Sequence, residues 1–248
     1  MMSSPFLAVR AVRAVKETKL RNPKTINHLN SISSKKAKAI SDAAAFELRK
    51  ITKQIQEDLF HESFEIVREK YKNKIGTIIA SAARESFFNG FAFVEKFAGK
   101  SLVISDLSEL NALISKNIES YWNAIQKAYR ERIQTSIHRE ILNASGSDIL
   151  TAVTSFLNAL TISLSFMSLN RGTVEASRTL PLRSTNIENA NTLMWVSERD
   201  AKVCPICQNF DGRVWNVEDS DIQYPVENSH FNCRCRLLPF INGKAFDG

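Results

Sequence analysis

The side chains best suited to chemistry lie near the end of the chain: Cys204, Cys207, His230, Cys233 and Cys235. All four cysteines of the sequence fall in this stretch. Two residues separate Cys204 from Cys207, a spacing that lets a short loop bring both sulfurs to one tetrahedral ion at about 2.3 Å. Cysteines clustered as CxxC and CxC pairs, without a secretory signal, indicate reduced thiols and a metal site.

Five candidates compete for four tetrahedral positions. If the chain is extended at Cys233 and Cys235, both sulfurs point the same way and His230 is left outside the coordination sphere. If His230 to Cys233 forms a tight turn, His230 and one of these two cysteines complete the set. The second arrangement is favoured, but the sequence leaves both open. Because four or five soft ligands fill a site completely, we expect one structural Zn²⁺ per chain.

Other uses of these residues fit less well. Two disulfides are an alternative in an exported particle. A redox CxxC normally opens a helix in a βαβ setting, and no such setting precedes Cys204. A catalytic zinc site needs an open position and a general base, and Glu198, Asp200 and Asp211 show no catalytic spacing. We therefore predict no catalytic residues and no enzyme.

The first two thirds of the chain have helical periodicity, with apolar residues recurring every three or four positions. Helices are predicted over residues 34–73, 77–98 and 105–143, with breaks at Gly76 and Gly99. Residues 149–170 carry no charge and include nine Ser, Thr or Asn residues. Their apolar positions form a stripe, which predicts a helix buried in protein and not in lipid.

After residue 193 the pattern changes to short strands between turns. Strands are predicted at 195–197, 213–215 and 236–241, with a turn at Asp211-Gly212. The predicted fold class is mainly α, with a long helical body and a small C-terminal β-rich zinc-binding module. The predicted divisions are a basic arm (1–33), the helical body (34–170), a connecting segment (171–193) and the Cys/His metal-binding module (194–248).

The positive charge is concentrated at the start of the chain. Residues 1–41 hold nine Lys or Arg and one Glu, whereas the whole chain has a net charge of +7. Such an arm suits an anionic partner such as DNA, RNA or an acidic protein face, and a solvated arm without a partner is the alternative.

The C-terminal motifs resemble a known family. They are the run from Trp195 to Cys207, the segment Asp211-Gly212-Arg213-Val214-Trp215, then Pro225, then His230 to Arg236. Together they are similar to the C-terminal signature of phage minor head proteins, the head morphogenesis or Mu F-like proteins of tailed bacteriophages. The similarity covers about residues 175–240.

This resemblance implies a minor capsid protein of the virion, made in the host cytoplasm and located in the capsid interior or at the portal vertex. It implies contacts with the portal or the major capsid protein, an oligomeric state in the particle, and roles in head assembly and DNA packaging or ejection. The basic arm is expected to reach packaged DNA, and no membrane is expected. The alternatives are a metal-dependent nuclease and a zinc-ribbon nucleic-acid-binding protein.

Overall fold

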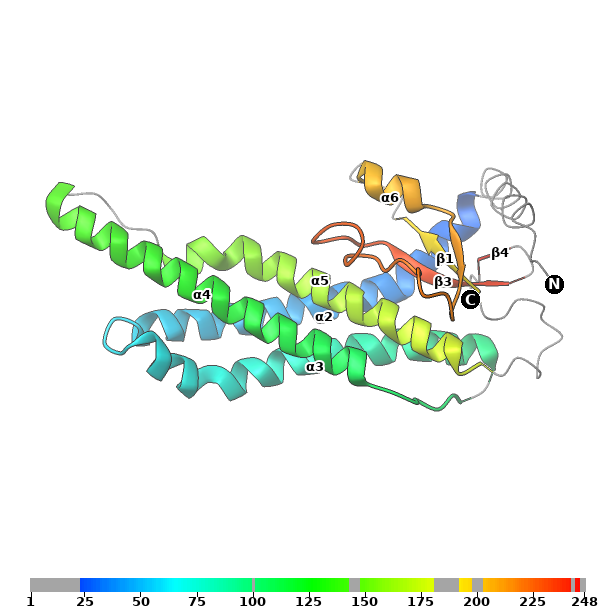
Figure 1. Ribbon diagram of the computed structural model, residues 1–248, viewed down its shortest axis with the longest axis horizontal. Helices are drawn as coiled ribbons and strands as arrows, with labels where there is room; N and C mark the ends of the chain where they lie inside the picture. The colour runs from blue at the N-terminus through cyan, green and yellow to red at the C-terminus, as the bar shows by residue number, and fades with distance from the viewer. Residues whose placement is uncertain are drawn as a thin grey trace.

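The computed structural model describes residues 23–99, 101–142, 148–180, 192–197, 203–241 and 244–245. Four long helices run side by side, and a small sheet lies against one side of them (Figure 1). The helices are α2 (Pro23–Asp58), α3 (Phe64–Ala98), α4 (Ser108–Leu142) and α5 (Ile149–Arg178). The predicted class, mainly α with a small sheet and a Cys/His cluster near the C-terminus, is confirmed.

Two helix boundaries differ from the sequence-based expectation. The first break comes between Asp58 and Phe64, while Gly76 lies inside α3. Asp58 anchors the turn because it accepts a hydrogen bond from the Tyr71 hydroxyl at 2.8 Å and pairs with Lys70 at 2.8 Å. Gly99 ends α3 in the left-handed conformation, as predicted.

The predicted basic arm falls largely outside the described residues. Residues 1–22 are not described, whereas residues 23–33, assigned to the arm from sequence, form the first turns of α2. Helix α5 continues to Arg178, past residue 170, where the helical body was expected to end.

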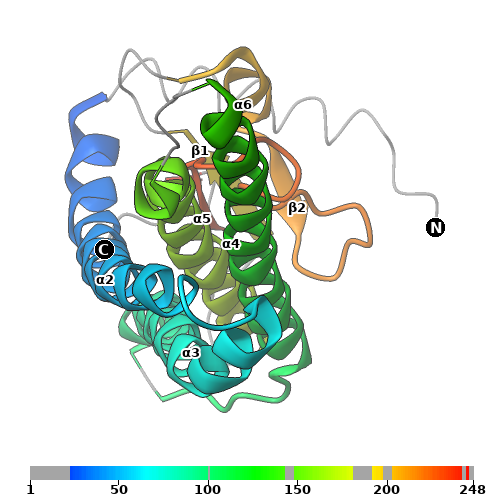
Figure 2. The same cartoon turned by 90° about the vertical axis from the view of Figure 1, so that its left-hand side faces the viewer.

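Helix α5 is central to the bundle and packs against α2, α3 and α4 (Figure 2). Asp148 caps its start by accepting a hydrogen bond from the Leu150 amide. Four of its hydroxyl side chains, those of Thr154, Thr161, Thr173 and Ser177, bond to carbonyls one turn earlier, which satisfies them inside the protein. Thr161 bonds to the Leu157 carbonyl at 3.0 Å, and Ser177 bonds to the Thr173 carbonyl at 2.8 Å.

By length and composition, α5 alone among the described helices could cross a membrane, and half of its most apolar 18-residue window is buried inside the fold. In this structure it is an interior helix that contacts three helices and the sheet.

Helices α3 and α5 approach each other closely at two glycines. A Cβ at Gly90 would lie 2.0 Å from the Leu169 carbonyl oxygen, and one at Gly172 would lie 2.0 Å from the Phe87 carbonyl oxygen. The two backbones are therefore in direct contact, and only glycine fits at these positions.

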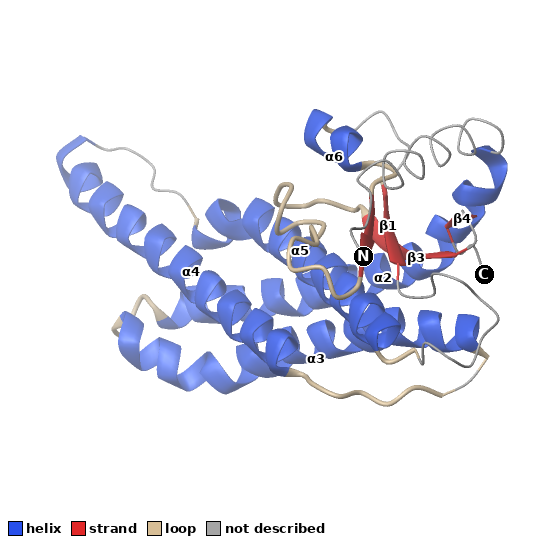
Figure 3. Ribbon diagram, turned by 45° about the vertical axis from the view of Figure 1, so that its right-hand side comes forward, coloured by secondary structure: helices blue, strands red, loops and turns tan. Residues whose placement is uncertain are grey.

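The sheet has the strand order β2-β1-β3-β4 and is antiparallel throughout. Its strands are the red elements in Figure 3. Its strands are β1 (Thr192–Val196), β2 (Val214–Asn216), β3 (Arg236–Ile241) and β4 (Lys244–Ala245), and a short helix, α6 (Pro205–Phe210), follows β1. The turn at Asp211-Gly212 is confirmed: Gly212 has a φ of 84° and its amide donates to the Trp195 carbonyl at 2.8 Å.

The C-terminal module shares its core with the bundle. Leu193, Trp195, Cys207 and Leu237 are buried in the same apolar cluster as the residues of α5. Strand β3 contacts α5 directly. The module is therefore packed onto the helices along one continuous core.

Candidate metal centre

The first ligand pair is placed by the start of α6. Cys204 is the N-cap of this helix, Pro205 is its first residue, and Cys207 is its third. The Cys207 amide donates to the Cys204 sulfur at 3.4 Å. Because Pro205 fixes its own φ and lacks an N–H, it fits the first helical position without losing a hydrogen bond. The CxxC pair thus opens a short helix, a geometry that the sequence did not predict.

The second group comes from the loop before β3. The Cys233 amide donates to the His230 carbonyl at 3.2 Å, and Asn232 has a φ of 69°. These features make His230 to Cys233 a tight turn, the backbone geometry on which the second of the two arrangements depends. Cys235 follows, immediately before Arg236 begins β3.

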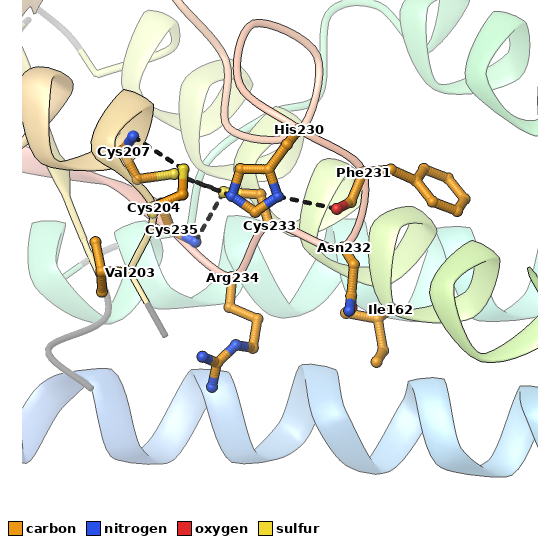
Figure 4. A pocket seen from close by; sticks show the side chains of 10 residues that line it. All are labelled: Ile162, Val203, Cys204, Cys207, His230, Phe231, Asn232, Cys233, Arg234 and Cys235. Carbon is orange, nitrogen blue, oxygen red and sulfur yellow. Dashed lines mark hydrogen bonds between the residues drawn. The ribbon is translucent and has the colours of Figure 1, made fainter. Parts of the chain in front are cut away.

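All five predicted site residues line one pocket of about 360 Å³. The ligand atoms form two sets, and within each set all atoms lie within 4.8 Å of one another. The first set is Cys204, Cys207 and His230, and the second is Cys207, Cys233 and Cys235. The Cys207 sulfur lies 3.3 Å from His230 Nε2 and 3.6 Å from the Cys233 sulfur. Figure 4 shows the imidazole facing the sulfurs, while Phe231 and Arg234 point away from them.

His230 has the orientation of a metal-binding imidazole. Its Nδ1 lies 2.9 Å from the Phe231 carbonyl oxygen. A carbonyl can only accept, so Nδ1 is the donor in this contact, and Nε2 is the ring nitrogen that faces the Cys207 sulfur. A hydrogen bond from the distal ring nitrogen to a carbonyl is the usual way in which proteins fix a histidine ligand.

The thiols differ strongly in acidity. Burial raises the pKa of Cys207 to about 12. The hydrogen bond from the Cys235 thiol lowers the pKa of Cys233 to about 5. Donating that hydrogen bond, together with burial, raises the pKa of Cys235. Buried thiols this close cannot all ionise alone, whereas a bound cation would replace their protons and stabilise several thiolates together.

The cysteines are free thiols in this structure, which does not contain the disulfides weighed from the sequence. Their chemistry is that of a soft-metal site, since thiolates and one imidazole converge within coordination range. The Cys/His cluster could therefore hold a metal ion.

Two residues that support the site were not identified from the sequence. Ser163 and Asn170 lie on α5: Ser163 accepts from the Asn232 amide at 2.8 Å, and Asn170 accepts from the Leu237 amide at 2.8 Å. They lie more than 60 positions from their partners, so no local pattern could reveal them. The only signal was their polarity in an otherwise apolar segment.

The carboxylates weighed as possible general bases are placed differently. Asp211 accepts from the Ser197 amide at 2.9 Å, and the Ser197 hydroxyl donates to the Cys207 carbonyl at 2.8 Å. Asp211 thus helps to hold the CxxC segment. Glu198 and Asp200 lie outside the described residues.

The comparisons with known proteins give one match. Residues 166–238 match the family described as Phage Mu protein F like protein. This segment begins in α5 and ends in β3, so it includes all five Cys/His residues and Asn170. No curated protein and no solved structure matches the chain.

Proposed function

We propose that the chain is a minor capsid protein of a tailed phage, a member of the phage head morphogenesis family, and the match of residues 166–238 to the family described as Phage Mu protein F like protein supports this. The family is generally non-enzymatic and implies a place in the virion. We assign the chain a structural role at the portal vertex or the inner capsid surface, in head assembly and in DNA packaging or ejection.

The observation that carries this proposal is the position of the family segment in the fold. It begins in the second half of α5 and ends in β3 of the Cys/His module. These two parts share buried apolar contacts. Arg171 of α5 pairs with Glu227 of the module at 2.7 Å and also with Glu109 of α4. A rigid unit built in this way suits a protein that must keep its shape inside a particle.

The proposed cofactor is one structural Zn²⁺ per chain. Zinc favours four tetrahedral thiolate and imidazole ligands, and structural sites of this kind leave no open position. The convergence of four cysteines and one histidine on one pocket supports this choice. Elemental analysis of the purified chain should find one zinc per chain, and absence of any metal from freshly purified reduced protein would contradict it.

The proposed partners are the portal and the major capsid protein, with packaged DNA reached by the basic segment before α2. Purified particles of the source phage provide the test. Mass spectrometry should find the chain in mature heads, at low copy, with cross-links to the portal or the shell. Particles that infect normally without the chain, or heads from which it is absent, would contradict the proposal.

A control separates this role from the nuclease and regulator alternatives. A chain with Cys207→Ser and Cys233→Ser loses two of the metal-site thiols. If the role is structural, phage carrying this variant should assemble defective heads. The phage DNA should remain intact and phage gene expression should be unchanged. Defects in DNA cleavage or transcription before assembly would favour the alternatives.

A further inference from the structure

We propose that the C-terminal end of α4 is a docking surface for a second copy of this chain, which binds there in the antiparallel direction. The surface is a stripe of four residues, Arg130, Ile133, Ile137 and Glu140, together with the apolar groove beside it. The proposal does not depend on the metal centre or on the role in the virion.

The last turns of α4 extend past the ends of the neighbouring helices (Figures 1 and 3). On these turns Ile133 is 41 % exposed and Ile137 is 57 % exposed. In the earlier turns the large apolar side chains are covered by the bundle, as at Leu110, Trp122 and Ile125. The apolar face of α4 therefore continues beyond the part of the helix that the rest of the chain covers.

A groove of about 250 Å³ lies beside this face, and Ile133 and Ile137 belong to its lining. Leu59 and Phe60, from the turn that follows α2, line the groove as well. Phe60 is 62 % exposed, and the Arg132 guanidinium lies 4.0 Å from the centre of its ring. The exposed apolar side chains of α4 and of this turn thus border one groove, and such a continuous patch marks an interaction surface more strongly than scattered residues do.

The stripe on α4 has the spacing of a helix-pairing face. Its members are separated by three, four and three positions, which is the repeat that keeps residues on one side of a helix in coiled-coil packing. Helix α4 continues to Leu142, so all four positions are helical. Two isoleucines form the middle of the stripe, with an arginine before them and a glutamate after them.

This order makes the stripe complementary to itself. Across a two-fold axis the same surface meets itself, so each residue faces the one that is equally far from the centre on the other side. With the axis at the midpoint between Ile133 and Ile137, each of these isoleucines faces the other one in the second copy. Arg130 then faces Glu140 of the second copy, and the same ion pair forms again at the other end of the stripe.

A parallel pair would not match in this way. It would place Arg130 against Arg130 and Glu140 against Glu140, and like charges on facing helices are unfavourable. The charge order therefore selects both the partner, a second copy, and its antiparallel direction. Because the stripe spans only about three helical turns, the interface is small and the association should be weak and concentration-dependent.

Sedimentation velocity of the full chain under reducing conditions, over a range of concentrations, provides the test. Wild type should pass from monomer to dimer as its concentration rises. Ile137→Asp should weaken the dimer by about 10-fold or more, because it places a charge in the apolar centre of the contact. Val103→Asp is the matched control: Val103 is 79 % exposed in the loop before α4, at the other end of that helix, so the dimer should not change.

Charge reversal tests the pairing of the two copies. Arg130→Glu alone, or Glu140→Arg alone, should weaken the dimer by about 10-fold because like charges then face each other at both ends of the stripe. The double variant, and an equimolar mixture of the two single variants, should regain the wild-type affinity, since every facing pair is again opposite in charge. Recovery in the mixture also shows that each single variant is folded.

A wild-type chain that stays monomeric at every concentration would overturn the proposal, and this is also the result expected if another protein occupies the groove. A dimer that Ile137→Asp leaves unchanged would overturn it too, because the contact would then lie elsewhere. A wild-type chain that binds Arg130→Glu more tightly than it binds itself would show parallel pairing and would contradict the antiparallel arrangement.

Discussion

Asn170 is the residue through which α5 holds the backbone on both sides of Arg236. Its amide nitrogen donates to the Cys235 carbonyl and its oxygen accepts from the Leu237 amide. The side chain is 1 % exposed, so water cannot replace either bond. A single buried amide therefore couples the start of β3 to the bundle.

Asn170→Ala should lower the free energy of unfolding by about 1–3 kcal/mol for each backbone group left without a partner. It should also weaken metal binding, because Cys235 loses its anchor. Chemical denaturation and metal titration of the same samples would measure both effects.

Asn117→Ala is the matched control. Asn117 is also a buried asparagine on a long helix, but the bond recorded for it goes to the Leu113 carbonyl of its own helix. This substitution should cost less stability and leave metal affinity unchanged. Equal losses from both variants would show that the contacts of Asn170 to the module carry no special weight.

At the scale of elements, the contact between α3 and α5 is set by Gly90 and Gly172. Gly90→Ala or Gly172→Ala would place a methyl group against a carbonyl oxygen of the facing helix. Each should destabilise the protein by about 1–3 kcal/mol, the usual cost of overpacking, or by more where the backbones cannot separate. Thermal or chemical unfolding would measure the change.

Gly76→Ala provides the opposite expectation. A Cβ at Gly76 would meet the Ile118 side chain at 3.6 Å, an ordinary contact. The substitution should therefore stabilise α3 by about 0.5–1 kcal/mol, because alanine is the better helix former. If Gly76→Ala destabilises the protein as much as Gly90→Ala does, the close approach of α3 and α5 is not the cause of the stability lost in Gly90→Ala.

The same elements show what the sequence could and could not reveal. Apolar spacing located the helices, and Gly99 and Asp211-Gly212 marked a real helix end and a real turn because their conformations are local. The helix break predicted at Gly76 was wrong, because packing against α4 allows α3 to continue through this glycine.

In the candidate site, too, local features could be predicted from the sequence and features that depend on distant contacts could not. The five Cys/His residues were identifiable because ligand chemistry is written in residue type and spacing. The way in which the two cysteine-bearing turns face each other could not be predicted, since the turn at His230 depends on a contact between Asn232 and Ser163 of α5.

At the scale of the whole molecule, the basic segment before α2 is expected to bind packaged DNA. Removing residues 1–22, which hold five Lys or Arg and one Glu, should weaken binding to duplex DNA. The logarithm of the affinity should fall with the logarithm of salt concentration, by about 0.9 per phosphate neutralised.

Fluorescence anisotropy of the full and shortened chains at several salt concentrations would measure this dependence. A full-length chain with the same Lys and Arg residues replaced by Gln is the control for length. Binding that persists unchanged in both variants would show that this segment is not the DNA contact.

The central claim is that the Cys/His module is a metal-held part of the same folded unit as the helical bundle. Hydrogen–deuterium exchange of the full chain, with metal and after chelation under reducing conditions, tests it most directly. We predict that metal removal exposes β1, β3 and also the half of α5 that carries Ser163 and Asn170, because their hydrogen bonds cross the junction. Unchanged exchange throughout, or loss of protection in the module with α5 fully protected, would contradict the claim.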